Sequence, residues 1–404
     1  MFETLLDAFL FRAGYNAALV TAGTTLLGIA AGSTGTFIFL RKRALISDAV
    51  AHATLPGVGI AFMVLVALGG DGRNLPALLA GSALSAWLGL LAVQWISRRT
   101  RLAEDAAIGA VLSVFFGGGI VLLTVIQTMT TGRRAGLEEF LLGATAGMLF
   151  HDAVFIAAAG LLVLTLVIAL RRAMTLVAFD PGFATSVGIS VARTDLAMMA
   201  LTMAVTVVGL KLVGLILIVA MLIIPPVAAR FWSDSMNSVV WIAGLIGGTS
   251  GFLGAALSAS APDLPTGPII VLVCFALFAV SITFAPQRGL FAAMLRYRAF
   301  HRHVHRRQGL LALARGEEIL DPVTVSVLRK AGLVRRDGVA TEAGRAQAAR
   351  ILRDERRWDI ARQIHRDEAV INRQDILRPI EDVLTRDEIA EIDRRIGPPE
   401  AVPS

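Results

Sequence analysis

Asp48 and His52, which lie one helical turn apart in an apolar stretch, are the residues best suited to do chemistry. At positions i and i+4 their side chains project from the same face of a helix. Ionisable groups are costly at membrane depth and usually mark a pathway or a ligand site. A carboxylate oxygen with a neutral imidazole nitrogen suits a borderline divalent cation such as Mn²⁺, Fe²⁺ or Zn²⁺. The alternative is a wetted interfacial loop, in which Asp48 caps the helix that follows.

The composition is that of a membrane protein with a charged tail. Of the 404 residues, 55% are hydrophobic and 17% are charged, and the mean hydropathy is +0.69. These values are typical of membrane-embedded chains rather than of soluble enzymes. Residues 286–404 hold 23 Lys or Arg and 18 Asp or Glu, against 15 and 13 in the longer first part. Cys274 is the sole cysteine, so one chain has neither a disulfide framework nor a thiolate metal site.

Nine apolar segments are expected to position these side chains, and several approach the roughly 20 residues that a helix needs to cross a bilayer. They cover residues 17–40, 45–68, 75–97, 106–128, 152–170, 196–210, 212–229, 236–257 and 267–285. The pair within 196–229 is short and interrupted by glycine and lysine, which fits two half-length helices of the kind found near transport sites. The sequence therefore predicts an all-α polytopic membrane protein with eight or nine transmembrane helices.

Arginine and lysine at the ends of these segments predict the orientation. Basic clusters lie at Arg41–Arg43, Arg98–Arg101, Arg171–Arg172, Arg230 and Arg288. The positive-inside rule places all of them in the cytoplasm. We expect a transmembrane domain over residues 1–285, a basic juxtamembrane linker over 286–308 and a small cytoplasmic domain over 309–404.

Four stretches in residues 15–285 carry a family resemblance, and they begin at Gly35, Glu104, Val213 and Asp263. The first resembles a basic turn followed by Asp-Ala-x-x-His-Ala-x-Leu-Pro-Gly, a pattern of the permease subunits of bacterial metal-ion ABC transporters. This family takes up manganese, zinc and iron(II) with a solute-binding protein. The other stretches are similar to its fourth-helix start, its Gly-x-Leu-Leu…Pro-Ala segment and the Leu-Pro-x-Gly start of its last helix. Pro226 replaces the usual small residue in the third stretch.

The resemblance implies that Asp48 and His52 line the central translocation pathway and coordinate the passing ion. It also implies that the equivalent pair of a second permease subunit completes the site. Two ligands from each subunit give four, which hold a divalent ion without caging it as a closed structural site would. A transport site must release its ion, so a moderate number of ligands suits it. Manganese is the favoured ion, and zinc or iron(II) would fit the same ligands.

Residues 179–189 contain a helix start and a helix stop. Asp180 followed by Pro181 predicts an N-cap with proline at the first helical position, and Gly188 predicts the stop. The segment follows Arg171–Arg172, so we expect it in the cytoplasm. Without the resemblance, an ordinary surface turn is an equal alternative. By the resemblance, the coupling helix that docks into a separate ATPase subunit comprises Phe179, Asp180, Pro181, Ala184 and Gly188.

Two further groups of polar residues have simpler explanations. Glu138 and Glu139 are expected at the external mouth, where they would attract cations or help a binding protein dock. A solvated helix end is an equal alternative for them. His301, His303 and His305 alternate with arginines that repel a cation, so contact with anionic lipid is favoured over metal binding.

The region after residue 309 has a winged-helix outline. We predict a helix over 322–331 that ends at Gly332, two strands around the Asp337–Gly338 turn, and a long helix to about Arg362. This α+β order resembles the DNA-binding half of iron- and manganese-dependent repressors, and some metal permeases carry such a tail. Asp382 stands where the repressors have a histidine ligand, and no one-sided basic stripe is visible. A regulatory or assembly module that contacts the ATPase or a second tail is favoured over DNA binding.

Together these features predict the permease subunit of an ABC transporter that imports a divalent transition-metal ion across the inner membrane. The sequence has no Gly-x-x-x-x-Gly-Lys-Ser/Thr phosphate cradle, so ATP hydrolysis is expected in the partner and not in this chain. The expected partners are the ATPase, a periplasmic or lipid-anchored metal-binding protein, a second permease subunit and membrane lipid, with no permanently bound cofactor. The alternatives are a membrane-tethered metal-responsive transcription regulator and an ATP-independent secondary transporter, in which residues 179–189 would be dispensable.

Overall fold

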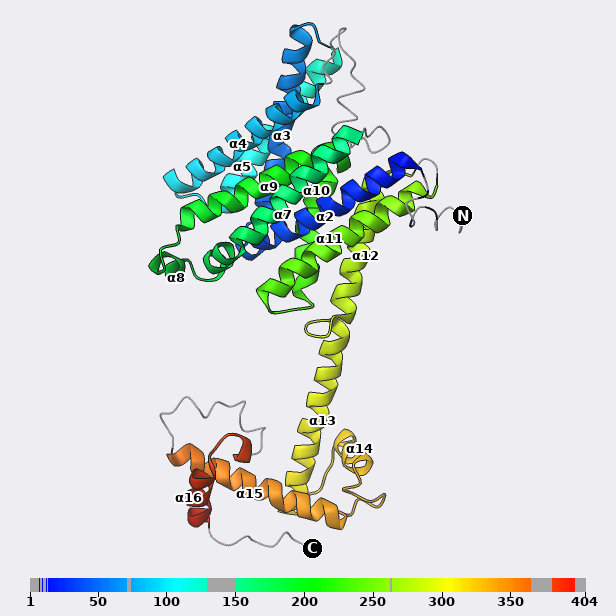
Figure 1. The fold of residues 1–404 in the computed structure, drawn as a ribbon. Helices are drawn as coiled ribbons and strands as arrows, with labels where there is room; N and C mark the ends of the chain where they lie inside the picture. The colour runs from blue at the N-terminus through cyan, green and yellow to red at the C-terminus, as the bar shows by residue number, and fades with distance from the viewer. Residues whose placement is uncertain are drawn as a thin grey trace. The chain divides into compact units, whose positions relative to one another are not determined.

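The computed structural model describes residues 14–70, 74–128, 150–261, 264–364 and 380–396, together with Asp7, Phe9 and Arg12. These residues are helical almost throughout (Figure 1). The chain divides into two compact units, Met1–Ala292 and Ala293–Ser404. The domain boundaries expected at residues 285 and 308 remain predictions beside this division.

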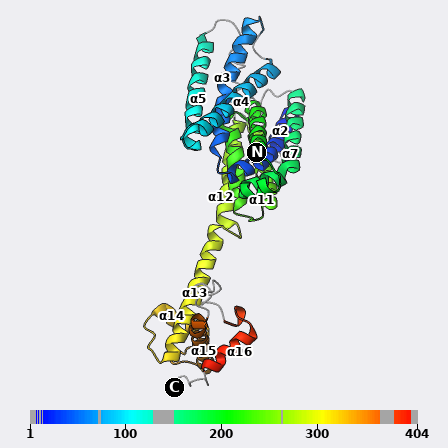
Figure 2. The ribbon, with the colours of Figure 1, turned by 90° about the vertical axis from the view of Figure 1, so that its left-hand side faces the viewer.

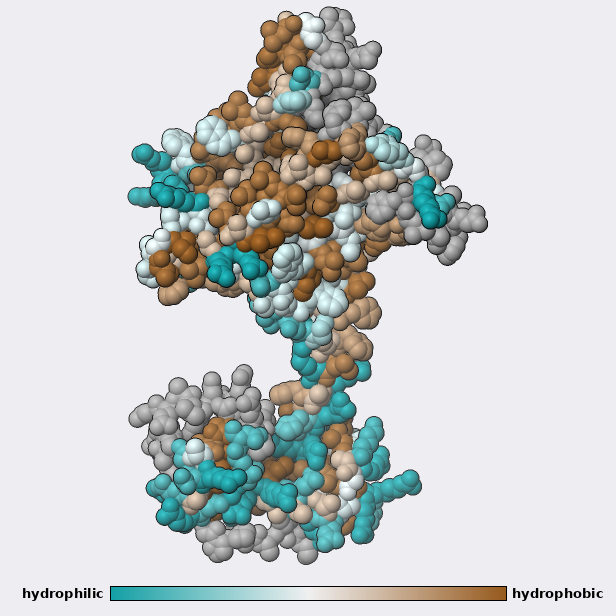
Figure 3. Space-filling view, viewed as in Figure 1, coloured by the Kyte–Doolittle hydropathy of each residue, from teal (hydrophilic) through white to brown (hydrophobic). Residues whose placement is uncertain are grey.

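The first unit is a helical bundle. Its helices are α2 (Tyr15–Leu40), α3 (Leu45–Ala67), α4 (Leu75–Arg99), α5 (Glu104–Thr128), α7 (Phe150–Phe179), α8 (Pro181–Ser186), α9 (Val191–Val213), α10 (Leu215–Arg230), α11 (Met236–Ala259) and α12 (Thr266–Phe284). Within the described ranges, eight helices are long and apolar enough to cross a membrane, and α10 is a shorter apolar helix of 16 residues. Apolar side chains dominate the face of this unit that Figure 3 shows. The predicted all-α polytopic architecture is thus confirmed for these residues.

Helix α2 lies at the centre of the bundle, where it contacts α7, α9, α10 and α11. Glycine allows this packing, because a Cβ atom on Gly28 would collide with the carbonyl oxygen of Gly247 on α11. A Cβ on Gly35 would collide in the same way with the carbonyl oxygen of Leu222 on α10. Small residues are expected where membrane helices approach closely, since lipid supplies no hydrophobic drive between them.

Helices α3, α4 and α5 pack against one another beside this centre (Figure 2). Buried apolar side chains from all three helices and from α9 form their shared core: Ile46, Val50, Leu90, Ile108 and Met199. This core holds the first turns of α3, which carry Asp48 and His52, against the rest of the bundle.

Helices α7 and α9 extend further than their apolar segments predict. Helix α9 begins at Val191 and has 23 residues, so the expected half-length helix over 196–210 is wrong. Hydropathy excludes the first turns of α9 because they contain Arg193 and Asp195, but charged residues are compatible with a helix that continues past the apolar layer. Helix α7 likewise continues past Arg171, whose guanidinium donates to the Asn237 side chain at 3.0 Å.

The second unit is also helical in its described part. It contains most of α13 (Leu290–Arg315), followed by α14 (Pro322–Lys330), α15 (Glu342–Ile364), the 3₁₀ turn η2 (Ile380–Asp382) and α16 (Arg386–Ile396). The predicted helix ending at Gly332 and the glycine turn are confirmed, with φ of 71° at Gly332 and 85° at Gly338. Polar side chains cover much of the face of this unit that Figure 3 shows.

The expected α+β character of the tail is wrong for the described residues. A single antiparallel bridge joins Val334 to Ala340, and no sheet forms there. Only about three residues on each side of the turn are available for pairing, because α14 ends just before the first arm and α15 begins just after the second. So short a hairpin needs a third strand or a covering helix to extend into a sheet. The winged-helix prediction is therefore not supported.

Arg357 on α15 is the central residue of an ion-pair network that joins α15 to α16. It is 8% exposed, and its guanidinium donates to the two oxygens of Asp393 at 2.7 and 2.6 Å. The hydrogen bonds from Arg357 hold the pKa of Asp393 below its usual range. Burial raises the pKa of Asp354, another neighbour of Arg357. The ion pairs surround an apolar core of Trp358, Ala361, Ile380 and Ile392.

Candidate functional site

The metal pair predicted from the sequence lies within the first eight residues of α3. Helix α3 begins at Leu45, and Asp48 occupies its first turn. His52 follows one turn later, with its Nε2 atom 3.4 Å from Oδ1 of Asp48. The side chains are 21% exposed for His52 and 36% exposed for Asp48. Asp48 is therefore inside the helix, and the alternative of a capping residue in an interfacial loop is not supported.

The surroundings of His52 are an aromatic ring, the Asp48 carboxylate and an interrupted stretch of helix. The ring of Phe116 on α5 meets it edge-on, with 4.9 Å between the centroids. The Nδ1 atom of His52 is buried and has no hydrogen-bond partner within the described ranges. Pro56, four residues later, has no N–H, so the carbonyl oxygen of His52 lacks its usual helical donor. The single apolar residue Phe116 carries no sequence signal that would have identified it.

One chain supplies only a small ligand set. Among the residues that the structure describes, no group of three or more His, Cys, Asp or Glu side chains is placed to hold a metal ion. Asp48 and His52 thus form a two-ligand edge with one carboxylate and one imidazole. Such an edge binds a divalent ion weakly unless further ligands come from elsewhere.

Helix α8 has the start and the stop that the sequence predicts. Oδ1 of Asp180 accepts a hydrogen bond from the backbone N–H of Phe183 at 2.8 Å, and Pro181 is the first helical residue. Gly188 has a φ of 84°, and the N–H groups of Gly188 and Ile189 bond back to the carbonyls of Thr185 and Ala184. This hydrogen-bond pattern is a Schellman motif.

Helix α8 has one buried face and one exposed face. Ala184 is fully buried and belongs to the core of the first unit. Phe183 is 55% exposed, and the flanking Phe179, which ends α7, and Val187, the C-cap of α8, are 59% and 57% exposed. Exposed large apolar side chains on a short capped helix are typical of a protein docking surface.

Comparison with known families decides the class of the protein. The ABC 3 transport family matches residues 15–285, about two thirds of the chain. The chain belongs to this family. The match covers all the bundle helices described above, including α3 with its Asp48–His52 pair and α8.

Individual relatives and a solved structure support the assignment to this family. It is 41% identical over 298 residues to the manganese transport system membrane protein MntC of Bacillus subtilis, covering 74% of this chain and 67% of that one. It is 39% identical over 279 residues to the zinc transport system membrane protein TroC of Treponema pallidum, covering 69% and 92%. Among solved structures, PsaBC from Streptococcus pneumoniae in complex with Fab has a TM-score of 0.61 at 27% identity, covering 71% of this chain and 98% of that one.

An ion-pair cluster that the sequence analysis missed lies at the same end of the bundle as α8. We call Arg41, Arg43, Glu104 and Asp195 the Arg41 cluster. Oδ2 of Asp195 lies 2.7 Å from Arg41 and 3.2 Å from Arg43, and Arg43 also pairs with Glu104 at 2.9 Å. The four side chains are 14% to 34% exposed. A carboxylate at the start of a membrane helix, here Asp195, is the sequence signal that would have pointed to it.

Two further groups of residues were singled out from the sequence. Glu138 and Glu139 fall outside the described residues. His301, His303 and His305 are on the helix α13, so they are not an extended alternating segment. Nδ1 of His305 lies 3.1 Å from Oδ2 of Asp321, the N-cap of α14, so this histidine joins two helices of the second unit.

Proposed function

We propose that this chain is the permease subunit of an ABC transporter that imports a divalent transition-metal ion across the inner membrane. The contact between Asp48 and His52 inside a membrane helix carries the proposal, because it places an oxygen and a nitrogen ligand on one edge. Manganese is the favoured cargo, and zinc or iron(II) would fit the same ligands. Relatives named for manganese and for zinc transport support this class of ion.

A second permease subunit completes the site in this proposal. Two ligands from α3 are too few to hold an ion during transport. The same edge from a second subunit, identical or homologous, gives two carboxylates and two imidazoles. The Asp48 and His52 side chains are partly exposed, 36% and 21% respectively, which is compatible with such a shared site.

Helix α8 is the coupling helix of the proposed transporter. The exposed Phe183 of α8, with Phe179 and Val187 on either side of the helix, offers an apolar surface to a separate ATPase subunit, where ATP is hydrolysed. By the positive-inside rule, the basic residues that flank the bundle helices favour a cytoplasmic position for α8 and for the second unit. A periplasmic or lipid-anchored binding protein delivers the ion to the opposite side. ATP binding and hydrolysis then move α8 and reorient the bundle around Asp48 and His52.

The second unit is proposed to be a regulatory or assembly module. Helices α13 and α14 border an open groove of about 800 Å³ that combines basic and apolar side chains. Its lining includes Arg302, Arg306, Val323, Val327 and Lys330. This chemistry fits an acidic amphipathic segment of the ATPase or of a second tail. The exposed Leu290, Phe291 and Met294 at the start of α13, with Arg288 and Arg296 nearby, fit contact with anionic lipid.

Uptake of mass-traced Mn²⁺, with Zn²⁺ and Fe²⁺ as competitors, tests the proposal. Cells would express the transporter with wild-type, Asp48→Ala or His52→Ala permease at matched membrane levels. Loss of at least tenfold in uptake of one ion by both variants is the expected result. Asp105→Ala, which removes an exposed carboxylate from the first turn of α5, is the matched control and should keep uptake. Normal uptake by both site variants would refute the assignment of the site.

The same cells separate the alternatives. Uptake that persists without the ATPase subunit would indicate a secondary transporter. Absence of uptake by the wild-type complex, together with salt-dependent DNA binding by the full-length protein, would favour a membrane-tethered regulator.

A further inference from the structure

We propose that the Arg41 cluster is a two-position link that transmits the motion of α8 to α3, and that Arg41 and Asp195 are positioning residues for transport. This inference rests on the proposed function, because it requires an ATPase to move α8. It concerns residues outside the metal pair and outside the docking surface. The first argument is the place of these residues in the chain.

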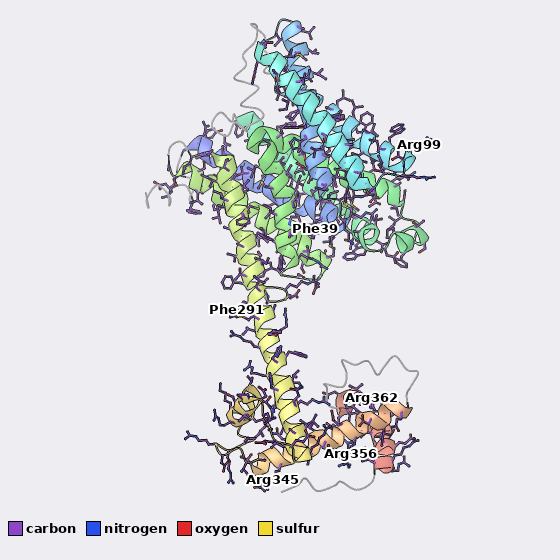
Figure 4. The ribbon with its side chains drawn as sticks, turned by 180° about the vertical axis from the view of Figure 1, so that it is seen from behind. Phe39, Arg99, Phe291, Arg345, Arg356 and Arg362 are labelled. Carbon is purple, nitrogen blue, oxygen red and sulfur yellow. The ribbon has the colours of Figure 1, made fainter. Side chains whose placement is uncertain are left out.

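Arg41 contacts the chain on both sides of α8. Its guanidinium donates to the carbonyl oxygen of Val177 at 3.2 Å, in the last turn of α7, and to Asp195 at 2.7 Å, the fifth residue of α9. Arg41 also ends α2, and the turn after it leads directly into α3 at Leu45. Figure 4 labels Phe39 in the last turn of α2, just before this turn. A displacement of α8 therefore reaches the helix of Asp48 and His52 through Arg41.

The unpaired atoms of the cluster indicate a second arrangement. Nε of Arg41 and Oδ1 of Asp195 are both buried, and neither has a hydrogen-bond partner within the described ranges. These atoms are the donor and the acceptor that a bidentate pair of the two side chains would join. Arg41 now uses Nη2 alone on Oδ2, an oxygen that it shares with Arg43. In the second arrangement Arg41 binds both oxygens of Asp195, and Arg43 keeps only Glu104.

Each arrangement has one unfavourable feature. In the present one, two buried polar atoms lack hydrogen-bond partners, which costs free energy. The second arrangement satisfies both atoms but releases one contact of Arg43. Two discrete positions of similar cost are what a coupling element needs, because both ends of the pathway can then bias the same equilibrium.

The turn that joins α2 to α3 is itself strained. Lys42 has a φ of 57°, and it is the sole non-glycine residue with positive φ in the described part of the chain. The N–H groups of Lys42 and Arg43 bond back to the carbonyls of Phe39 and Ile38. This is the same Schellman motif that ends α8, but there Gly188 occupies the left-handed position. A lysine in this position persists only where the surroundings hold it, and such strain clusters at switching segments.

The test is the number of metal ions imported per ATP hydrolysed by the whole complex in vesicles. Asp195→Asn keeps the shape of the side chain and removes its charge. We expect it to lower Mn²⁺ uptake at least tenfold while ATP hydrolysis stays within twofold of wild type, so the ratio falls. Arg41→Lys keeps a positive charge but cannot form the bidentate pair, and it should lower the ratio in the same direction. Asp195→Glu, which keeps the carboxylate, should restore at least part of it.

Asp234→Asn is the matched control, because Asp234 forms an exposed pair with Arg288 outside the Arg41 cluster. Its ratio should equal that of wild type. A merely structural role would lower uptake and hydrolysis together and leave the ratio unchanged. If the ratio is unchanged in both Asp195→Asn and Arg41→Lys, the inference is overturned. Import by the wild-type complex in the same experiment would leave the proposed function intact. Absence of import by the wild-type complex would instead refute the proposed function itself.

Discussion

The packing of α2 against α11 and the packing of α15 against α16 use opposite means. Gly28 and Gly247 bring two helix backbones into contact without any charge. Arg357 and Asp393 join their two helices by ion pairs around an apolar core. Lipid offers no hydrophobic drive between helices, so close packing of small residues provides the contact area there. The tail has water at its rim, where charged pairs can form. The α2–α11 contact should therefore be sensitive to added bulk, and the α15–α16 contact to loss of charge.

Bulk at the glycine contact should have the largest effect. Gly247→Leu places a side chain where the carbonyl oxygen of Gly28 lies, and the atom that must yield is backbone. We expect destabilisation on the order of 3 kcal/mol or more, with most of the protein lost from the monodisperse fraction after detergent extraction. Gly118→Leu is the control, because no atom lies within 4 Å of its Cβ position. Equal yields of the two variants would contradict the packing described for α2 and α11.

Removal of the buried guanidinium should have a somewhat smaller effect, confined to the tail. Arg357→Ala leaves the carboxylates of Asp393 and Asp354 without their main partner. The expected cost is about 3 kcal/mol of tail stability, seen as faster hydrogen exchange in α15 and α16 with unchanged exchange in α2. Arg395→Ala removes only an exposed pair with Glu391 and should cost at most about 0.5 kcal/mol. Faster exchange in α2 as well would show that the two regions do not respond separately.

Acid should have the smallest effect, with a response in the packing of α15 against α16 and none in the glycine contact between α2 and α11. Hydrogen bonds from Arg357 lower the pKa of Asp393, so its contribution is present above the unfolded-state pKa of about 4. That contribution is lost as the pH falls through the lower folded-state pKa. Burial raises the pKa of Asp354, so its ionised form opposes folding until it is protonated at a higher pH. Mild acid should therefore first stabilise the tail slightly and stronger acid should destabilise it.

Hydrogen exchange of α15 and α16 against pH measures this dependence. Asp393→Asn should flatten the loss in strong acid, and Asp354→Asn should remove the gain in mild acid. The contact between α2 and α11 has no ionisable group, so its exchange should follow only the intrinsic effect of pH. A similar acid transition in the part of α2 around Gly28 would contradict the distinction.

Local patterns were sufficient to predict the elements that carry the proposed site. The spacing of Asp48 and His52 on one helix, the cap at Asp180 and the stop at Gly188 all depend on a few neighbouring residues. The contact of Phe116 with His52 and the Arg41 cluster depend on residues far apart in the chain. No single sequence shows such pairs, because any of many aromatic or charged residues would satisfy the same local pattern.

Each error of the sequence analysis has its own physical cause. Hydropathy located the start of α9 five residues late, because it treats Asp195 as the edge of the apolar layer rather than as a paired residue within a helix. In the tail, the Asp337–Gly338 turn was correctly predicted, but two arms of about three residues form one bridge and no sheet. A turn signal determines where the chain reverses, not how far the pairing continues.

The link between α9 and α10 limits which length changes the gene can accept. Gly214 alone separates the two helices, with a φ of 79°. One inserted or deleted residue that extended or shortened α10 would rotate its following residues by about 100° around the helix axis. The buried side chains of Leu217, Ile218 and Met221 would then turn away from the core of the bundle. Insertions and deletions should therefore be absent at this position in functional homologues, whereas substitutions on the exposed faces should accumulate freely.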